Sequence, residues 1–424
     1  AFRHIKAIFD PKSLLNPGNL IDMKPETMVS ALRVKPKDRV LDVPAVQTFY
    51  RYEREHGFGE AVEMCNGAGV CRKMKGGTMC PSYRGTLDER HATRGRGNAL
   101  RLAITGQLWA EGAESGMAGA PKWDDAETKA TLDLCLSCKA CKSECPSNVD
   151  IAKLKAEYTA QSFAARGSIP LRTRIIANVR TLNRLGSVTH PIANFINRLP
   201  PVRAIGNRLM GFHPRRELPR FGQSLYRWMS QRRATPAGRP AVILFPDCFT
   251  VYNEPHIGRA AVEVLERLGY RVVLPKIGCC GRTYLSTGML EQAQRVCRET
   301  ALVLRECVQR ENAIAVVACE PSCLSAIKDD WLELDMGTEV DVQSLRELAA
   351  KSFLAEQFIE ARWDAHPQAP AWLQRYAQAA EAPILLHGHC HQKALWGVET
   401  SARLLQRLFG EQARVLDSGC WGMA

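Results

Sequence analysis

The sequence predicts a multidomain α+β chain in which a mostly helical, cysteine-rich region precedes an α/β region built from two repeated strand–helix–strand units. Two observations carry this prediction. Seven cysteines lie in short spacings among helical segments between residues 65 and 145. From residue 237 onward, a pattern of apolar strand, amphipathic helix and apolar strand occurs twice, with cysteines at the strand ends. A length of 424 residues is enough for two or three domains with sizeable cores.

The most specific pattern in the chain is C-x2-C-x2-C-x3-C-P, formed by Cys135, Cys138, Cys141, Cys145 and Pro146. This is the bacterial ferredoxin pattern, in which three cysteines hold one [4Fe–4S] cubane and the fourth ligates a second cluster. Buried or disulfide cysteines rarely match four fixed positions and a proline. Zinc sites are the stronger alternative, but they usually come as two separated pairs. The spacing therefore predicts an electron carrier.

A second cysteine group upstream supplies the partner motif. Cys65, Cys71 and Cys80-Pro81 follow the same pattern, with Ala68 where the second cysteine would stand. The cysteine–proline linkage predicts an exchange of fourth ligands between the two motifs. One cluster would be held by Cys80, Cys135, Cys138 and Cys141. The other would be held by Cys65, Cys71 and Cys145, with three protein thiolates, as a [3Fe–4S] cluster or a [4Fe–4S] cluster with one non-cysteine ligand.

Composition agrees with a redox protein of a reducing compartment, because sixteen cysteines in metal-type spacings do not suggest a disulfide scaffold. No signal peptide and no apolar run of membrane-spanning length is found. The net charge of +13 is concentrated between Arg166 and Arg233, which contain fourteen arginines and one acidic residue, Glu217. This segment is either a solvated connector or an amphipathic surface for anionic lipid or an acidic partner. No nucleic-acid-binding motif accompanies it, so no nucleic acid is expected as a partner.

The repeat in the C-terminal region places cysteines at strand ends. Its first copy spans 245–281 and its second spans 387–422. Each copy begins with a strand that leads to a cysteine, Cys248 or Cys390, and ends at Cys279-Cys280-Gly281 or Cys420-Trp421-Gly422. The strand–helix–strand order implies parallel pairing, which brings strand ends to one edge of a sheet.

Between the copies, another strand ends at Cys319, with Cys323 one helical turn later. Convergence of cysteines at one sheet edge predicts metal or cluster binding, and structural thiols are the alternative. The predicted ligands are Cys248, Cys279, Cys280, Cys319 and Cys323, together with Cys390 and Cys420 of the second copy. His389 and His391 are either further ligands or hydrogen-bond donors to sulfur. Cys297 and Cys307 lie on a helix outside these motifs and are expected to be ordinary buried residues.

These motifs resemble known families. The C-terminal repeat resembles the cysteine-rich CCG domain found in the B subunit of heterodisulfide reductase, in the C subunit of anaerobic glycerol-3-phosphate dehydrogenase and in the iron–sulfur subunits of glycolate oxidase. Residues 64–101 (CNGAGVCRK, GTMCPSY, HATRGRGNALR) look like the two-cluster module of FAD-linked D-lactate and D-2-hydroxyglutarate dehydrogenases. The string FDPKSLLNPGNL, from Phe9 to Leu20, resembles the end of the FAD-linked oxidase C-terminal domain.

The resemblance implies an iron–sulfur electron-transfer part of a flavin-dependent D-2-hydroxy acid dehydrogenase, an oxidoreductase acting on CH–OH donors. Its cofactors would be [4Fe–4S] clusters, with [3Fe–4S] as the alternative for one of them, a further cluster or metal in the CCG domain, and FAD in an N-terminal domain that this sequence does not contain. Its partners would be that flavin domain and a quinone or electron-transfer flavoprotein as acceptor. The chain would be cytoplasmic, with a peripheral contact to the inner face of the membrane through residues 166–233.

The expected domain organisation follows. Residues 1–34 are the tail of the FAD-linked oxidase domain, 35–60 a linker, 61–160 a helical two-cluster ferredoxin-type domain, 161–236 a basic helical connector and 237–424 the CCG domain, with a truncated second module. Since Trp421 replaces the second cysteine of the pair, the second module is not expected to hold a cluster alone. Two other functions remain open: a heterodisulfide reductase-like thiol/disulfide protein and a structural zinc-binding interaction protein. His91, Arg94 and Arg96 are expected to be surface residues or to support the cluster motif, and not to act as catalysts.

Overall fold

The computed structural model describes residues 1–19, 21–26, 46–105, 121–233, 236, 238–377 and 382–419, and it divides into two units. The smaller unit, residues 1–46 and 102–122, begins with helix α1 (Phe2–Phe9). Beyond α1, the Asp10 carboxylate accepts hydrogen bonds from the amides of Leu14 and Leu15 and pairs with Lys6. The hydrogen bond from Lys6 holds the pKa of Asp10 below its usual value. This turn lies within the Phe9–Leu20 string.

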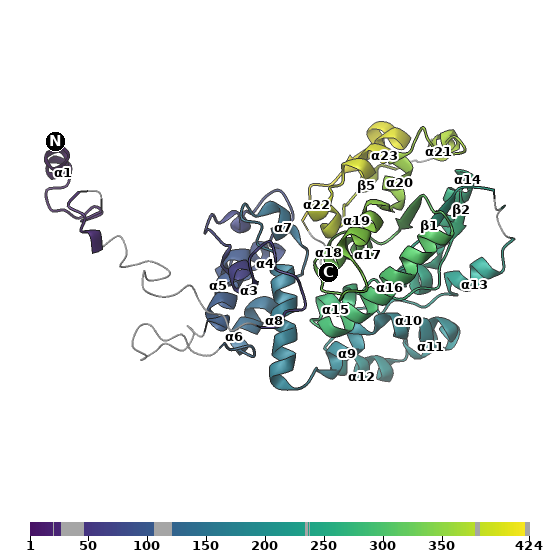
Figure 1. The fold of residues 1–424 in the computed structure, drawn as a ribbon, viewed down its shortest axis with the longest axis horizontal. Coiled ribbons are helices and arrows are strands. Elements are labelled where there is room, and N and C mark those ends of the chain that lie inside the picture. The colour runs from purple at the N-terminus through teal and green to yellow at the C-terminus, as the bar shows by residue number, and fades with distance from the viewer. Residues whose placement is uncertain are drawn as a thin grey trace. The chain divides into compact units, whose positions relative to one another are not determined.

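The larger unit, residues 47–101 and 123–424, begins with short helices around the cysteine motifs (Figure 1). They are α3 (Phe58–Glu63), α4 (Pro81–Thr86), α5 (Thr93–Ile104), α6 (Ala126–Asp133), α7 (Ala140–Glu144) and α8 (Ile151–Arg166). Helix α8 is the central one: Asp150 caps its first turn, Gly167 ends it in the left-handed conformation, and most of its residues are buried. Its Glu157 accepts hydrogen bonds from the amides of Phe49 and Tyr50. The described part of the predicted linker 35–60 is thereby attached to α8, whereas residues 27–45 lie outside the described residues.

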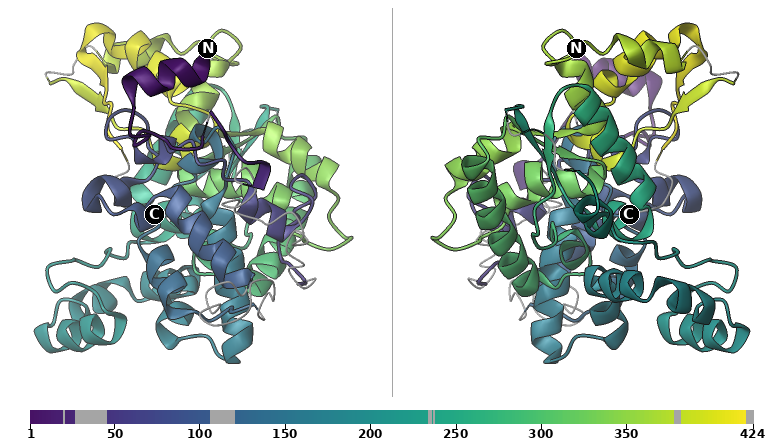
Figure 2. Two further views of the ribbon diagram at one scale, coloured as in Figure 1. Left: turned by 90° about the vertical axis from the view of Figure 1, so that its left-hand side faces the viewer. Right: turned by 90° about the vertical axis from the view of Figure 1, so that its right-hand side faces the viewer.

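The arginine-rich segment forms helices, and those between residues 171 and 210 lie together along the lower edge of the larger unit (Figure 1). The helices of the segment are α9 (Leu171–Ala177), α10 (Val179–Val188), α11 (His190–Ile196), α12 (Pro200–Met210) and α13 (Leu225–Ser230). Prolines at the first turns of α11 and α12 start these helices where a missing amide hydrogen costs little. Figure 2 shows the teal helices of this segment extending from the side of the unit.

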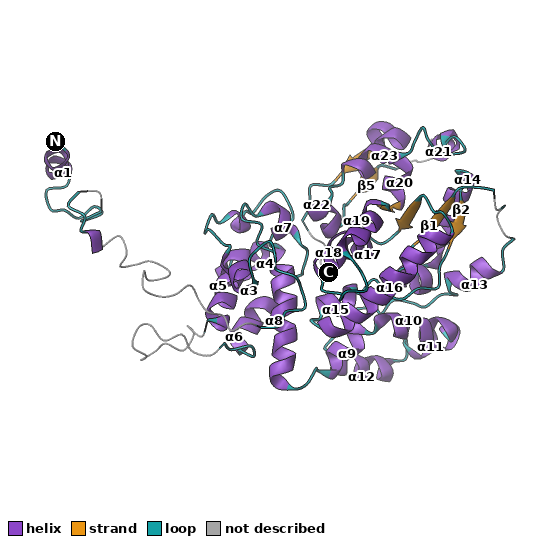
Figure 3. Ribbon diagram, viewed as in Figure 1, coloured by secondary structure: helices purple, strands orange, loops and turns teal. Residues whose placement is uncertain are grey.

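A four-stranded parallel sheet forms the core of the α/β region (Figure 3). Its strands are β1 (Ala241–Leu244), β2 (Arg271–Val273), β3 (Ala315–Ala318) and β4 (Ser352–Leu354), in the order β2-β1-β3-β4. The register pairs Val242 with both Val272 and Ala315. All four residues of β1 and of β3 are buried, as expected for central strands covered on both faces.

Helices connect and cover this sheet. They are α14 (Pro255–Arg267), α15 (Arg282–Ser286), α16 (Leu290–Arg310), α17 (Pro321–Ser325), α18 (Trp331–Glu333), α19 (Val342–Ala350) and α20 (Ala355–Ala361). Tyr270, Phe358 and the side chains of β1 and β3 make up its main apolar cluster. Since apolar burial is the main stabilising contribution to folding, this cluster fixes the positions of the loops that follow the strands.

The second repeat copy builds a separate two-stranded parallel sheet from β5 (Ile384–Leu386) and β6 (Ala413–Val415). Helix α21 (Ala371–Ala377) precedes it, and α22 (Cys390–Leu395) and α23 (Glu399–Phe409) connect its strands. The predicted combination of a helical region with a mixed helix–sheet region is confirmed, and both copies pair their strands in parallel. In the described part of the chain, no helix is both long enough and apolar enough to cross a bilayer.

Candidate metal centres

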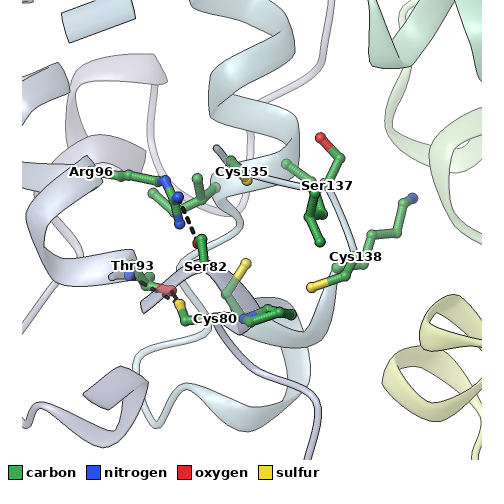
Figure 4. A pocket seen from close by; sticks show the side chains of 13 residues that line it. Cys80, Ser82, Thr93, Arg96, Cys135, Ser137 and Cys138 are labelled. Atoms are coloured by element: carbon green, nitrogen blue, oxygen red, sulfur yellow. Dashed lines mark hydrogen bonds between the residues drawn. The ribbon is translucent and has the colours of Figure 1, made fainter. Parts of the chain in front are cut away.

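Four cysteines from two distant segments line one pocket. Cys80 comes from the upstream motif, and Cys135, Cys138 and Cys141 come from the downstream motif. Figure 4 shows Cys80, Cys135 and Cys138 around this space, which measures about 320 Å³ with open solvent included. This is the set that the cysteine–proline linkage predicts for one cluster.

The backbone around this pocket adopts a conformation that non-glycine residues seldom use. Cys80, Ser137 and Lys139 have φ angles of 52°, 49° and 61°. Left-handed residues of this kind each cost about 1–3 kcal/mol and persist where the surrounding structure imposes them, often at functional sites. Here they let Pro81 start α4 directly after Cys80 and turn the downstream loop so that Cys138 and Cys141 face the pocket.

The pocket is arranged to interact with sulfur. The amide of Thr93 donates a hydrogen bond to Cys80 Sγ at 3.2 Å, and the Thr93 hydroxyl lies 3.0 Å from the same sulfur. Burial raises the pKa of Cys80 to about 11 and raises the pKa of Cys141 well above its usual value. Buried thiolates therefore need a compensating positive charge, which a bound metal centre supplies when it deprotonates its ligands.

Arg96 is one of the residues expected to lie at the surface or to support the cluster motif, and it is buried beside this pocket. It donates hydrogen bonds to the Ser82 hydroxyl, seen in Figure 4, and to the Thr131 carbonyl. Lys155 donates to the carbonyl of Cys135. The two cations connect α5 and α8 to the loops that carry the cysteines, so they position the ligands.

The second predicted ligand set is Cys65, Cys71 and Cys145, and direct contacts bring only part of this set together. Burial raises the pKa of Cys71, and Cys65 is close enough to Cys71 to add to this effect. Arg94 interacts with both of them and donates to the carbonyl of Gly67, next to Ala68.

Cys145, the third member of this set, directly follows α7. The last residue of α7, Glu144, accepts hydrogen bonds from the amides of Thr78 and Met79 and pairs with Lys73. Glu144 thus attaches the end of α7 to the loop between Cys71 and Cys80, a contact that no motif indicated.

In the cysteine-rich region, four of the five predicted thiols form a row of contacting thiols at the ends of the parallel strands. Cys279 accepts hydrogen bonds from Cys248 and from Cys280, and these hold the pKa of Cys279 well below its usual value. The Cys280 sulfur also lies 3.1 Å from the Cys323 sulfur, and its single S–H donates to only one of the two neighbouring sulfurs at a time. All four are buried. Cys319 is not part of this row of contacting thiols. Burial and nearby carboxylates raise its pKa.

A cation from the arginine-rich segment contacts this row of contacting thiols. Arg180 of α10 donates to the carbonyls of Pro246 and Ile277 at 2.9 and 2.8 Å, and its guanidinium lies 3.7 Å from Cys248 Sγ. Although burial opposes the charge, the Cys248 thiol raises the pKa of Arg180. One of the fourteen arginines is therefore part of the site and not of a solvated surface.

Two further features shape the loops after β2 and β1. Gly281 has a φ of 86°, and a Cβ atom there would collide with Cys297 Sγ. Cys297 is fully buried and donates to the Cys280 carbonyl, so it supports the cysteine pair from α16. Cys307 is also buried.

In the loop after β1, Asp247 Oδ2 is buried without a hydrogen-bond partner, and burial raises the pKa of Asp247 to about 6.

The second copy uses its cysteine region differently. Cys390 begins α22 and is buried, with His389 Nδ1 at 4.0 Å from its sulfur. Because this nitrogen accepts a hydrogen bond from the His391 amide, it does not donate to the sulfur, and the expected donor role of His389 is wrong for this nitrogen. Both ring nitrogens of His391 are engaged elsewhere: Nδ1 with the Ser325 hydroxyl at 2.8 Å and Nε2 with the Ser137 carbonyl at 3.0 Å. His391 therefore joins the downstream cysteine loop to α17 and bonds to no sulfur. Cys420 lies outside the described residues.

A buried ionic network connects the same two regions. Lys139, between Cys138 and Cys141, pairs with Asp329 at 2.6 Å and with Asp330 at 2.7 Å. Arg282, directly after Gly281, also pairs with Asp330 at 3.0 Å. The network thus runs from the loop of one candidate centre to the loop of the other.

Among the described residues, no three cysteine, histidine or acidic side chains are arranged to hold a single metal ion. Thiolates around one zinc lie only about 4 Å apart, because Zn–S bonds are about 2.3 Å long and tetrahedral. The four cysteines that line the first pocket are the thiolate set that a ferredoxin-type motif supplies, and a polynuclear cluster is the group that such a donor set fits.

The fold and these thiol centres fit a class of protein: iron–sulfur chains in which a dicluster region is followed by a cysteine-rich α/β region. Comparison with known proteins agrees. Residues 61–149 match the family model "4Fe-4S dicluster domain", and residues 242–328 match "Cysteine-rich domain". No solved structure matches the chain.

The chain is similar to dehydrogenases and to a lactate utilization protein. It is 26% identical to D-2-hydroxyglutarate dehydrogenase of Escherichia coli K12 over all of this chain and 42% of that protein. It is 27% identical to the C subunit of anaerobic glycerol-3-phosphate dehydrogenase of the same organism, over 66% of this chain and 67% of that protein. Lactate utilization protein A of an Exiguobacterium species is 28% identical over 38% of this chain and 61% of that protein.

The expected resemblance to D-hydroxy acid dehydrogenases with fused iron–sulfur domains is thereby confirmed. The chain spans less than half the length of the D-2-hydroxyglutarate dehydrogenases that it matches.

Proposed function

We propose that this chain is the electron-transfer part of a flavin-dependent D-2-hydroxy acid dehydrogenase. One observation carries the proposal: Cys80 and three cysteines of a motif far along the chain line a single pocket. Iron–sulfur clusters, when bound, accept and release single electrons at potentials set by their surroundings. Similarity to D-2-hydroxyglutarate dehydrogenase over the whole chain supports the link to a hydroxy acid.

The residues of the first pocket would each have a defined task. Cys80, Cys135, Cys138 and Cys141 would hold a [4Fe–4S] cluster. The Thr93 amide and hydroxyl would donate to the sulfur of Cys80, which favours the more negative, reduced state of a centre and so raises its potential. Arg96 and Lys155 would keep the ligand loops in place.

The second site would be held by Cys65, Cys71 and Cys145, with Ala68 at the position that lacks a thiolate. Three thiolates suit a [3Fe–4S] cluster or a [4Fe–4S] cluster with one other ligand. Arg94 would balance part of the negative charge of this site, because it interacts with both Cys65 and Cys71.

The cysteine-rich region would hold a further metal or cluster through the contacting thiols Cys248, Cys279, Cys280 and Cys323, with Cys319 beside them and Cys390 and Cys420 as the remaining candidates. Arg180 would favour the thiolate form of Cys248. The bridge through Lys139 and His391 would fix the separation between this region and the first pocket. Electron transfer between them depends on that separation remaining constant.

The substrate chemistry would take place outside the described residues. By the resemblance of the Phe9–Leu20 string to an FAD-linked oxidase domain, a flavin domain would remove a hydride from the α-carbon of a D-2-hydroxy acid. The electrons would then pass through this chain to a quinone or an electron-transfer flavoprotein.

The first experiment is an iron and acid-labile sulfide count on anaerobically purified protein, with electron paramagnetic resonance as isolated and after dithionite. We expect about seven or more irons per chain and signals of reduced cubanes. The Cys138→Ala variant should lose about four irons, whereas Cys307→Ala, a buried cysteine outside the motifs, should lose none. Zinc without sulfide would contradict the proposal and leave a structural metal protein.

The sulfur–sulfur contact of 3.1 Å between Cys280 and Cys323 favours a second candidate, a thiol/disulfide redox centre. In that case the two thiols would form a disulfide as they release two electrons and two protons, with the electrons passing to the dicluster region. A titration of free thiols in the oxidised and reduced protein distinguishes the two functions. A difference of about two thiols per chain that disappears in Cys323→Ser would favour the disulfide.

A further inference from the structure

Helix α10 has its polar side buried and its apolar side exposed. Its buried side carries Asn183, Gly186 and Ser187, which contact the loops around Phe221 and Asn253. The opposite side carries Leu182, Leu185 and Val188, which are 44%, 62% and 78% exposed. A surface helix of a globular protein normally shows the reverse arrangement.

The neighbouring helices also expose apolar side chains. In α11, Asn194 is bonded to the backbone of Phe221 while Ile192, Phe195 and Ile196 are exposed. Helix α12 adds Val202, Ile205 and Leu209, all exposed and three or four residues apart, the spacing of side chains that share one helix face. We call this set of exposed apolar side chains the α10–α12 face. Its members are Leu182, Leu185, Val188, Ile192, Phe195, Ile196, Val202, Ile205 and Leu209.

The charges around this face are almost all positive. Arg184 of α10, Arg198 after α11 and Arg208 of α12 are exposed. Arg198, Arg203 and Arg220 line a cavity of about 290 Å³, together with Glu217, the only acidic residue between Arg166 and Arg233. Exposed leucine, isoleucine and phenylalanine rimmed by arginine are the pattern of helices that lie in the interface of a bilayer.

We propose that the α10–α12 face docks on the surface of an anionic lipid bilayer. The apolar side chains enter the boundary between headgroups and acyl chains, and the arginines contact lipid phosphates. A second copy of the chain fits less well, because two such faces would bring two arginine clusters together with almost no acidic residue between them. This docking does not require the proposed electron transfer to be correct.

Docking at this face is compatible with the rest of the larger unit. The polar side of α10 carries Arg180, which is anchored at Pro246, Ile277 and Cys248. A bilayer on the opposite side of the helix therefore displaces none of the contacts between α10 and the cysteine-rich region.

The test is sedimentation of the full chain with vesicles of phosphatidylcholine containing about 30% phosphatidylglycerol, compared with pure phosphatidylcholine, at low and high salt. We expect binding to the anionic vesicles that weakens about tenfold or more in high salt and in neutral vesicles. The double variant Leu185→Glu/Ile192→Glu should lose binding by at least about tenfold, because it places charge in the apolar face. Both side chains are exposed, so folding should be unaffected.

The matched control is Val303→Glu/Ile257→Glu, which adds the same two charges at exposed apolar side chains of α16 and α14, outside the face. It should bind vesicles about as the wild type does. Equal binding by wild type and Leu185→Glu/Ile192→Glu, or no binding to anionic vesicles, would overturn the proposal. The molar mass in solution, measured by light scattering, covers the alternative occupant: a dimer that dissociates in Leu185→Glu/Ile192→Glu, without vesicle binding, would assign the face to a second copy.

Discussion

The two strand–helix–strand copies of the α/β region share a sequence pattern but surround their cysteines differently. In the first copy, the strands are adjacent members of a four-stranded sheet, and Cys248, Cys279 and Cys280 contact one another. In the second copy, β5 and β6 form their own sheet, which is partly exposed. There Cys390 begins a helix that packs against α7 of the dicluster region.

The difference shows that the pattern determines local structure but not chemistry. Both copies produce a parallel strand pair and a loop with a cysteine. What surrounds the loop decides its role: in the first copy Arg180, Cys297 and Cys323 surround the thiols, and in the second His391 extends to the loop of Cys138. The first copy forms a thiol centre, whereas the second copy connects the α/β region to the dicluster region.

The largest expected effect separates the two copies by metal content. Cys280→Ser should remove the whole centre of the cysteine-rich region, because Cys280 contacts both Cys279 and Cys323. Cys390→Ser should lower the iron content much less. Iron and sulfide per chain, with circular dichroism to verify folding, measure both. An equal loss in the two variants would mean that the copies share one centre.

The next effect concerns the ionic bridge. Lys139→Met removes the cation that Asp329 and Asp330 share, while Lys142 still pairs with Asp329 and Arg282 with Asp330. The apparent free energy of unfolding in urea should therefore fall by about 2–3 kcal/mol. The control is Lys129→Met, whose pair with Asp124 is at the surface, where less than about 1 kcal/mol is expected. If Lys139→Met is as mild as the control, the bridge does not hold the two regions together.

A smaller effect is expected at His391. Its replacement by alanine leaves the Ser137 carbonyl and the Ser325 hydroxyl without their shared partner, at a cost of about 1–3 kcal/mol. His366→Ala removes another buried histidine, which bonds only within the α/β region, to Tyr270 and Ile359. Hydrogen exchange should rise at residues 135–142 in His391→Ala alone. A similar rise in His366→Ala would argue against a specific brace.

The smallest effect is a dependence on pH. Burial lowers the pKa of both His366 and His391 below the ordinary value. The unfolded chain then binds protons near pH ~6.5 that the folded chain does not, so stability falls as the pH drops below about 6.5. Each histidine contributes at most about 1.4 kcal/mol per pH unit. In His366→Gln and in His391→Gln the slope of stability from about pH 6.5 to about 5 should become flatter, and an unchanged slope in both would contradict this origin of the pH dependence.

Much of the candidate site follows from local sequence. The cysteine–proline linkage predicted that Cys80 would join Cys135, Cys138 and Cys141, because a fixed spacing constrains a tight loop. The apolar runs before Cys248 and Cys319 predicted buried parallel strands, since alternation is absent where both faces are covered.

The remaining features depend on contacts between residues far apart in the sequence. Lys139 meets Asp329 across 190 positions and His391 meets Ser137 across 254, and no local pattern encodes such pairs. His391 was expected to be a ligand or a donor to sulfur because its neighbour is Cys390. Arg180 looked like one of many solvated arginines, because charge counts do not reveal which side of a helix is buried.

The position of Lys139 also limits how the chain can be divided. Its side chain leaves the cysteine loop of one family domain and ends among carboxylates that follow a strand of the other. A fragment cut between these domains would expose Lys139, which is buried among carboxylates in the whole chain, to water. The other fragment would expose Asp329 and Asp330, the two carboxylates that pair with it. The two regions therefore have to be expressed, loaded and engineered together, and a chimera that exchanges one of them must also carry the matching charges of the other.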